Sequence, residues 1–335
     1  MNERVGQLFM VGEDSRRISS TQLARIHSLH IGSVILLGNT TSGRSSVKHL
    51  TDQVRSRAGS TDGARVLLAA DQEGGLVQRL KGSGFSTIPS ARTQSKSTNA
   101  SLESHATTWA KQLKAAGIDA DLAPVADVVP TSMEKVNQPI GVLKRGYGPD
   151  PKTVAAKVGA FVKGMHRGGI ATSVKHFPGL GRVRGNTDFD RKVVDSVTTR
   201  HDADLAGFAR GISNGTDMVM VSSATYSKID ARHPATFSTT VLQGMIRSDQ
   251  KFGGVIISDD LNGKALSSIS IGSKAVRFID AGGDLAIVGD PALVSSAVSH
   301  TVGEARSSRS FGVKVTAATT KVLTMKAKRG LTSCS

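Results

Sequence analysis

Cysteine and aromatic residues are scarce in this sequence. The chain of 335 residues holds one cysteine, Cys334, second from its end. A single cysteine excludes an internal disulfide framework and a cysteine metal cluster. Only 4% of the residues are aromatic, and neither zinc-finger spacing nor an aromatic-rich basic sheet motif is present. We therefore expect no metal, no cofactor and no specific recognition of nucleic acid.

Long hydrophobic runs are also missing. No window approaches the roughly 20 uninterrupted apolar residues that a membrane-spanning helix needs. The first residues, MNERVGQLFMVG, lack the basic start and apolar centre of a signal peptide. We expect a soluble chain, either cytoplasmic or a mature form whose export segment has been removed. Of these two, we favour the secreted or cell-envelope location.

Acidic residues are few relative to basic ones. The chain has 43 Lys and Arg against 27 Asp and Glu, a formal net charge of +16 and a pI of about 10.2. This balance predicts attraction to polyanions. The basic residues are scattered along the chain, so an anionic cell-wall polymer, or simple solubility, explains the charge as well as nucleic acid does. The sequence does not determine the oligomeric state.

The sequence does contain a regular series of short apolar runs bounded by turn residues. Stretches of 10–20 residues with helical periodicity separate most of them, such as DPKTVAAKVGAFVKGMHRGG and STTVLQGMIRSDQKFGG. Apolar strands that alternate with amphipathic helices indicate a parallel sheet buried on both faces. Eight such repeats predict a closed (β/α)8 barrel. The runs are 7–12, 31–38, 64–75, 118–128, 169–179, 216–226, 253–261 and 282–290.

A single domain is expected over residues 1–325. No change of composition marks a second domain, and no G-x-G-x-x-G follows the first strand, which argues against a dinucleotide-binding sheet. The Ser/Thr-rich stretch 86–101 is interpreted as a long loop within the barrel. Residues 326–335 are interpreted as a basic, frayed tail.

Polar residues follow most of the predicted strands, at the end of the barrel where such proteins place their chemistry. The strand ends carry Asp71, Gln72, Glu73, Asp127, Lys175, His176, Ser222, Ser223, Asp259 and Asp260. Any one of these carboxylates could simply cap the next helix. Several of them on one rim, with Lys and Arg but without a His-rich ligand set, suit the recognition of a polyhydroxylated substrate such as a sugar.

The motifs DQEGGLVQRL, APVADV, KHFPGLG, PATFS and GGVIISDDL resemble those of the family 3 glycoside hydrolases in order and spacing. The resemblance is to the single-domain barrel branch of bacterial β-N-acetylglucosaminidases and covers the chain to about residue 325. It implies a retaining mechanism, in which a carboxylate attacks the anomeric carbon and a second group protonates the leaving oxygen. By this resemblance Asp259, after the serine in ISDDL, is the nucleophile. The substrate-binding residues that it implies are Asp71, Arg79, Arg145, Lys175 and His176.

Structural explanations stand beside these implied roles. Asp259 could cap a helix, as its neighbour Asp260 equally could, and His176 could be a satisfied core histidine. Lys175 is the strongest candidate for binding, since a lysine at the end of a buried strand is costly unless it meets an anion or a ligand.

The acid/base group departs from the family pattern. In the usual form, the seventh residue after KHFPGHG is the histidine of an Asp-Ser-His group. Here the three positions read Asn186, Thr187 and Asp188. The second histidine of KHFPGHG is Leu180, and the arginine of the usual EGGRV is Leu76.

Three explanations of this departure remain open. Asp188, or Asp190 two residues on, could be a carboxylic acid/base with a pKa raised by burial. Alternatively, the leaving group is an activated one, or phosphate replaces water. Finally, the barrel could bind without turnover, with the stretch GNTD acting only as a turn. Nearby arginines would lower the pKa of either carboxyl unless they point away, and these are Arg182, Arg184 and Arg191.

Two functions follow from the sequence. The first is a retaining, exo-acting β-glycoside hydrolase of β-N-acetylhexosaminidase type, acting on bacterial cell-wall or related glycans with Asp259 and Asp188 as catalytic residues. The alternative is a barrel that binds anionic glycan without hydrolysing it.

Overall fold

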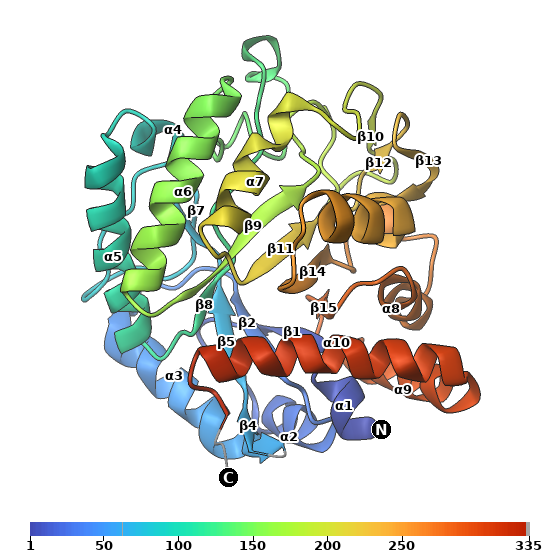
Figure 1. The fold of residues 1–335 in the computed structure, drawn as a ribbon. Helices are drawn as coiled ribbons and strands as arrows, with labels where there is room; N and C mark the ends of the chain where they lie inside the picture. The colour runs from blue at the N-terminus through green and yellow to red at the C-terminus, as the bar shows by residue number, and fades with distance from the viewer. Residues whose placement is uncertain (62, 333–335) are drawn as a thin grey trace.

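A closed barrel forms the centre of the molecule (Figure 1). The computed structural model describes residues 1–61 and 63–332, so Cys334 lies outside the described residues. Within the described residues, eight parallel strands pair in the order β1-β15-β14-β11-β9-β8-β5-β2, which makes strands that follow one another in the chain neighbours in the barrel. Each coincides with one of the eight apolar runs, and the predicted (β/α)8 barrel is confirmed. The strands are β1 (Phe9–Asp14), β2 (Ser33–Leu37), β5 (Leu67–Ala70), β8 (Ala120–Asp121), β9 (Ala171–Phe177), β11 (Met218–Val221), β14 (Val255–Asp260) and β15 (Leu285–Val288).

Helices surround the barrel and connect its strands (Figure 1). The α-helices are α1 (Asn2–Gly6), α2 (Ser20–Ser28), α3 (Gly43–Ala58), α4 (Ala91–Gln94), α5 (Asn99–Ala115), α6 (Pro151–Arg167), α7 (Ala206–Ser213), α8 (Ile271–Asp280), α9 (Val294–Ser307) and α10 (Arg309–Lys328). Short 3-10 turns lie at Thr131–Met133, Ala203–Leu205, Ala235–Phe237 and Lys264–Leu266.

Both helices singled out from the sequence are present. Helix α6 begins with Pro151, and the Asp150 side chain accepts hydrogen bonds from the first backbone amides, as expected for a helix start. The second stretch forms a π-helix over Thr240–Asp249. Its start is held by the Ser238 hydroxyl, which accepts from the amide of Val241 at 3.3 Å.

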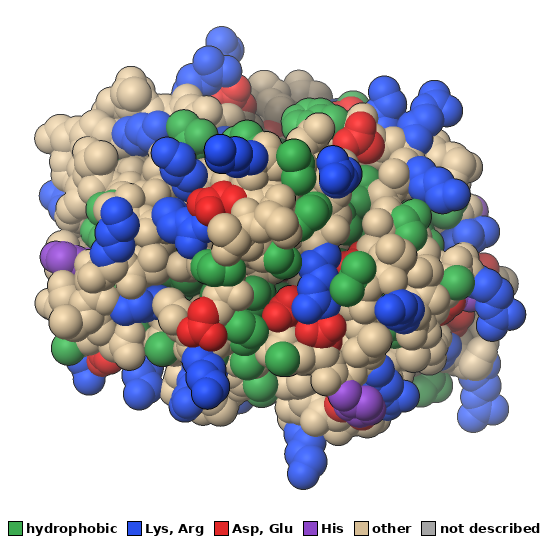
Figure 2. Space-filling view, turned by 90° about the horizontal axis from the view of Figure 1, so that it is seen from above, with side chains coloured by type: hydrophobic (Ala, Val, Ile, Leu, Met, Phe, Trp, Pro, Cys, Tyr) green, Lys and Arg blue, Asp and Glu red, His purple; other side chains and the backbone are tan. Residues whose placement is uncertain are grey.

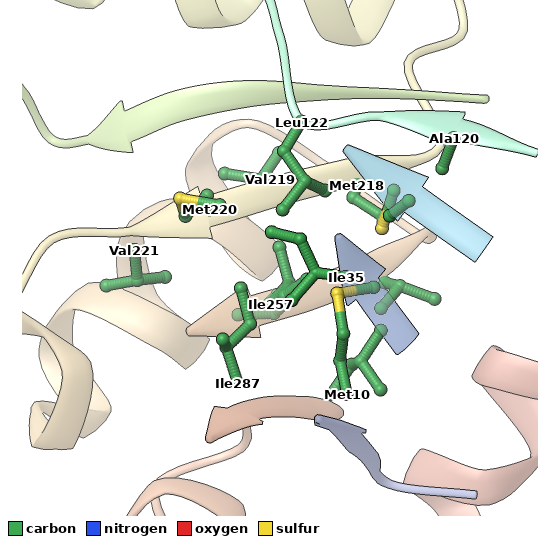
Figure 3. Packing of buried hydrophobic residues seen from close by; sticks show 14 of the residues in the cluster. Met10, Ile35, Ala120, Leu122, Met218, Val219, Met220, Val221, Ile257 and Ile287 are labelled. Atoms are coloured by element: carbon green, nitrogen blue, oxygen red, sulfur yellow. The ribbon is translucent and has the colours of Figure 1, made fainter. Parts of the chain in front are cut away.

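Apolar side chains from different strands fill the barrel. Met10, Ile35, Met218 and Ile257 meet in its interior (Figure 3), because inward-pointing residues of a (β/α)8 barrel stack in layers. Some of the interior residues also line a cavity at the carboxyl ends of the strands. They are Ile35, Leu122, Met220 and Ile287. The rigid core therefore supports the site directly.

Long connections lie at the carboxyl ends of the strands. The connection after β5 contains a hairpin of β6 (Gln72–Gly74) and β7 (Val77–Gln78). The connection after β9 contains β10 (Val194–Asp195), which pairs with β12 (Thr225–Tyr226), and β12 in turn pairs with β13 (Asp230–Pro234). At the opposite end, β3 (Ser60–Thr61) pairs with β4 (Ala64–Arg65). The predicted loop 86–101 is not wholly irregular, because it contains α4 and the start of α5.

The end of the described chain is packed rather than frayed. Helix α10 runs across the barrel (Figure 1), and the last described residue, Thr332, pairs with Ala64 of β4. The ammonium of Lys326 is fully buried and donates to Gln7 Oε1 at 2.6 Å, and burial lowers its pKa to about 7. The Leu331 carbonyl accepts from the amide of Arg65 at 2.8 Å. The expectation of a frayed tail is therefore wrong for residues 326–332, because the end of α10 and these hydrogen bonds hold the segment. No helix in the described part of the chain is both long and apolar enough to cross a membrane.

Arg329 tests this packing, because it forms a bidentate ion pair with the buried Asp217 at 2.6 and 2.8 Å. Arg329→Met leaves this carboxylate without its main counter-ion and should lower the free energy of unfolding by roughly 3 kcal/mol. The control Lys328→Met removes an exposed cation from the same turn and should cost under about 1 kcal/mol. Urea unfolding at pH 7 measures both. Equal effects would show that the ion pair does not hold the segment.

Candidate active site

One cavity of about 370 Å³ opens at the carboxyl ends of the barrel strands. Side chains from the ends of β5, β9 and β14, and from the connections after β5, β8 and β9, line it. All seven residues selected from the sequence are among them, namely Asp71, Arg79, Arg145, Lys175, His176, Asp188 and Asp259. The fold thus brings together residues up to 188 positions apart in the chain.

A buried charge network lies on one side of the cavity. The Lys175 ammonium donates to Asp71 Oδ1 at 2.6 Å and lies 2.7 Å from Glu73 Oε1. Arg145 donates to both oxygens of Glu73, at 2.7 and 2.9 Å. Two cations and two carboxylates therefore alternate, and each buried charge has a partner, as burial requires.

These contacts determine the ionisation of the network. Burial alone would raise the pKa of Glu73, but Arg145 and Lys175 outweigh it and hold that pKa well below its usual range. Burial likewise lowers the pKa of Lys175, and the carboxylates of Asp71 and Glu73 reverse this effect and raise it. Glu73 is recognisable in the sequence as a strand-end residue but is not among the residues predicted for the site. The sequence signal for Glu73 is its place in the DQEGG motif directly after β5. Its pairing could not be predicted, because its partner Arg145 is 72 positions away in the chain.

His176 is held by a carboxylate as well. Its Nδ1 lies 2.8 Å from Asp127 Oδ2, and its backbone amide donates to Asp127 Oδ1 at 3.1 Å. The amide of Leu180 donates to the same oxygen at 2.8 Å. Asp127, which is fully buried, thereby fixes the ring and the turn that follows β9. His176 is a buried histidine, and it also lines the cavity.

Asp259 lies at the end of β14 and contributes to the cavity wall. It does not cap a helix, because α8 begins at Ile271 and is capped by the Ser270 hydroxyl. Its neighbour Asp260 accepts instead from the amides of Asn262 and Gly289, both at 2.9 Å. Burial raises the pKa of Asp259 to about 6, with His176 opposing the rise and the Asp188 carboxylate adding to it.

Asp188 lies on the loop after β9, at the open edge of the cavity, and is exposed to solvent. Its carbonyl accepts from the amide of Lys264 at 3.2 Å, and the carbonyl of Thr187 accepts from the amide of Ala265 at 3.0 Å. The loop that carries Asp188 is thus docked on the loop that follows the Asp259 strand. The burial invoked for a carboxylic acid at this position is absent, because the side chain projects from the docked loop into solvent.

Asp190 and Arg182 have other partners. Asp190 Oδ2 accepts from the amide of Asn186 at 2.8 Å and so closes a turn. Arg182 lies 2.5 Å from Asp202 and 2.8 Å from Asp204. Arg182 therefore pairs with Asp202 and Asp204, and not with Asp188 or Asp190, whose pKa it was expected to lower.

Two polar groups near the network have no protein partner within the described residues. Arg79 lines the cavity and its buried Nε makes no hydrogen bond, while its Nη1 lies 3.5 Å from Asn39 Oδ1. Oδ2 of the fully buried Asp121 is also unpaired, and burial raises the pKa of this carboxyl to about 8. Unpaired buried groups of this kind are available to a ligand or carry a proton. Across residues 1–61 and 63–332, no group of three or more His, Cys, Asp or Glu side chains could hold a metal ion.

A (β/α)8 barrel places enzyme active sites at the carboxyl ends of its strands. A cavity there that combines an elevated carboxyl pKa with a buried network of Lys, Arg and carboxylates is typical of an enzyme site and suits a hydroxyl-rich substrate. The comparisons with known proteins are more specific. Residues 1–325 match the glycosyl hydrolase family 3 N-terminal domain. The chain belongs to this family and is a glycoside hydrolase.

Individual relatives agree with this assignment. The chain is 32% identical over 305 residues to a beta-hexosaminidase of Xylella fastidiosa (strain 9a5c), covering 88% of this chain and 87% of the relative. It is 31% identical over 307 residues to a beta-hexosaminidase of Stenotrophomonas maltophilia (strain R551-3), with the same coverage. The solved structure of a beta-N-acetylhexosaminidase from Beutenbergia cavernae superposes with a TM-score of 0.95 at 40% identity, covering 97% of this chain and 98% of that one.

The importance of Glu73 can be measured through stability. Glu73→Gln removes one of the two anions that neutralise Lys175 and Arg145, so it should lower the free energy of unfolding by roughly 3 kcal/mol. The matched control is Glu134→Gln, which breaks a more exposed ion pair with Arg92 and should cost at most about 1 kcal/mol. Thermal and urea unfolding report both values. If Glu73→Gln lowers the free energy of unfolding no more than the control does, the network does not stabilise the fold.

Proposed function

We propose that this protein is a retaining, exo-acting β-N-acetylhexosaminidase with Asp259 as its nucleophile. The observation that carries the proposal is the position of Asp259. Its carboxylate lies at the end of β14 in the same cavity as the network around Lys175. The names of the relatives support the sugar, and the cavity at the end of a barrel suits the removal of one terminal residue.

The reaction divides into two displacements. In the first, an ionised Asp259 oxygen bonds to the anomeric carbon, the bond to the leaving oxygen breaks, and that oxygen takes a proton from the acid. In the second, water attacks the same carbon, the bond to Asp259 breaks, and the water's proton returns to the same group. We assign this acid/base role to Asp188, which also lines the cavity.

The sugar is held by the remaining predicted residues. We propose that Asp71 accepts hydrogen bonds from ring hydroxyls and that Lys175, His176 and Arg145 donate to sugar oxygens. Arg79 lines the cavity as well, and we propose that its guanidinium also donates to the sugar. Pairing with Glu73 and Asp127 fixes the donors before the sugar arrives, which reduces the cost of ordering them on binding.

The pH profile of 4-nitrophenyl β-N-acetylglucosaminide hydrolysis tests the nucleophile. Asp259 must be ionised to attack, and its pKa is about 6, so kcat/KM should fall as the pH drops below about 6. Asp259→Ala should lower kcat/KM by roughly 10⁴-fold or more. Undiminished activity in this variant, with the fold intact by circular dichroism, would refute the assignment.

The role of Asp188 has its own signature. Asp188→Asn removes a charge that raises the pKa of Asp259, so the acidic limb should move to lower pH. The same variant should slow glycosides with poor leaving groups by roughly 10²-fold or more and aryl glycosides much less. An equal effect on both kinds of leaving group would show that Asp188 is not the acid.

A second candidate function is binding of an anionic cell-wall glycan without hydrolysis. The loops after β8 and β9 carry exposed cations that form no ion pair within the described residues, namely Lys135, Lys144, Arg184, Arg191 and Lys192. On the face seen from above, Lys and Arg side chains are widely spread, and acidic and hydrophobic side chains gather near the centre (Figure 2). These cations, together with the replaced histidine, favour this candidate.

Salt-dependent binding separates the two candidates. The Asp259→Ala protein should bind a purified polyuronate more weakly at 200 mM than at 50 mM salt, because screening weakens exposed charge pairs. The triple change Arg184→Gln, Arg191→Gln and Lys192→Gln should reduce this binding several-fold. The control changes Arg306→Gln and Lys328→Gln, on α9 and α10, should not. Steady hydrolysis by the parent protein excludes a function limited to binding, and salt-independent affinity excludes the cationic loops as the binding surface.

A further inference from the structure

Two exposed apolar side chains stand at the mouth of the cavity. Leu76 is 67% exposed and Phe189 is 73% exposed, and both line the same cavity as Asp259. Leu76 is on the β6–β7 hairpin, and Phe189 directly follows Asp188 on the loop after β9. They therefore approach the cavity entrance from two separate connections.

The distribution of exposed apolar residues singles out this rim. The large hydrophobic side chains exposed on the connections after β5, β8 and β9 are Leu76, Val136, Val142, Phe189, Val194 and Val197. In the rest of the described chain, only Met1 and Val313 belong to the same exposed group. Single exposed apolar residues are ordinary. Of these six, Leu76 and Phe189 are the two that line the cavity, and an exposed apolar pair at a cavity is typical of a binding surface.

The position of the pair relative to the chemistry identifies what it would contact. The sugar at the reacting carbon belongs in the deep part of the cavity, beside the buried Lys175 and His176. An exo-acting enzyme then directs the leaving group out through the mouth. The residue that protonates the leaving oxygen is proposed to be Asp188, and Phe189 is its neighbour in the chain. The two exposed side chains thus border the leaving-group side of the scissile bond.

We propose that Leu76 and Phe189 form a leaving-group subsite that selects β-N-acetylhexosaminides with an aromatic leaving group. This proposal rests on the proposed function. An aromatic ring would cover both side chains and remove apolar surface from water, and ring pairs add a favourable contact with Phe189. A hydroxyl-rich sugar leaving group gains less from such a surface.

The exposed acid/base candidate points to the same substrate class. Asp188 is exposed to solvent rather than enclosed in an apolar pocket, and such a position suits a leaving group that needs little proton donation. A phenol departs with little help from an acid, because its anion is far more stable than that of a sugar alcohol. Apolar recognition of the leaving group and a weak demand for proton donation therefore occur together at this rim.

The test compares substrates with one sugar and different leaving groups. The kcat/KM values of the parent, Leu76→Ala and Phe189→Ala are measured for 2-naphthyl β-N-acetylglucosaminide, the corresponding glycosyl fluoride and chitobiose. The ratio of naphthyl glycoside to fluoride should fall about tenfold in Phe189→Ala and several-fold in Leu76→Ala. The control Val313→Ala changes an equally exposed side chain on α10 and should leave the ratio unchanged.

A binding measurement separates failure of the subsite from failure of the proposed function. The parent should bind a non-hydrolysable 2-naphthyl thioglycoside about tenfold more tightly than the methyl thioglycoside, and Phe189→Ala should lose this difference. That result supports the subsite even if no substrate is turned over, in which case only the proposed function fails. Turnover of the fluoride with unchanged ratios and equal thioglycoside affinities overturns the subsite alone. An equal loss for chitobiose and the naphthyl glycoside overturns the aromatic preference in favour of a sugar ring.

Discussion

The site depends on the burial of Lys175 at the end of β9. An ammonium group in the barrel interior must be neutralised, and Asp71 and Glu73 do this from the end of β5 at 2.6 and 2.7 Å. Glu73 in turn requires Arg145 from the connection after β8. The pairing requirement therefore ties strand β9 to the connections after β5 and β8 around the cavity. Because the charges satisfy one another, the donors keep fixed directions while the cavity stays open.

The same charges give the acidic residues around the cavity different pKa values. The two cations hold the pKa of Glu73 far below its usual range. Burial dominates for Asp121, whose pKa rises to about 8 although Lys175 acts against the rise. Asp259 lies between these extremes, with a pKa of about 6, because His176 opposes burial and Asp188 reinforces it. One anion is thus permanently charged, one carboxyl is protonated at neutral pH and one is poised near it, a separation typical of catalytic sites.

The sequence predicts the barrel well because its signal is local. Each buried parallel strand is a continuous apolar run, and strand ends must face one rim, so the sequence alone places Asp71, Lys175 and Asp259 together. Features that depend on distant partners are not predictable in this way. The pairing of Glu73 with Arg145 spans 72 positions, and the ion pair that packs Arg329 against Asp217 spans 112. The exposure of Asp188 also cannot be predicted from the sequence. Its loop is held by backbone hydrogen bonds, which do not depend on residue type.

Those backbone contacts fix the loop that carries Asp188, the residue proposed as the acid/base. Asn137 donates to the carbonyls of Leu180 and Val183, both at 2.7 Å, and the amide of Lys264 donates to the carbonyl of Asp188. These contacts all engage main-chain carbonyls of the loop, which are present whatever side chain stands at position 188. Asp188, which stands where the family resemblance implies a histidine, is thereby kept at the edge of the cavity. With Asp259 as the proposed nucleophile, an exposed acid/base carboxyl favours leaving groups that need little proton donation. The exposed ring of Phe189, beside that position, lies where it would influence which leaving groups are accepted.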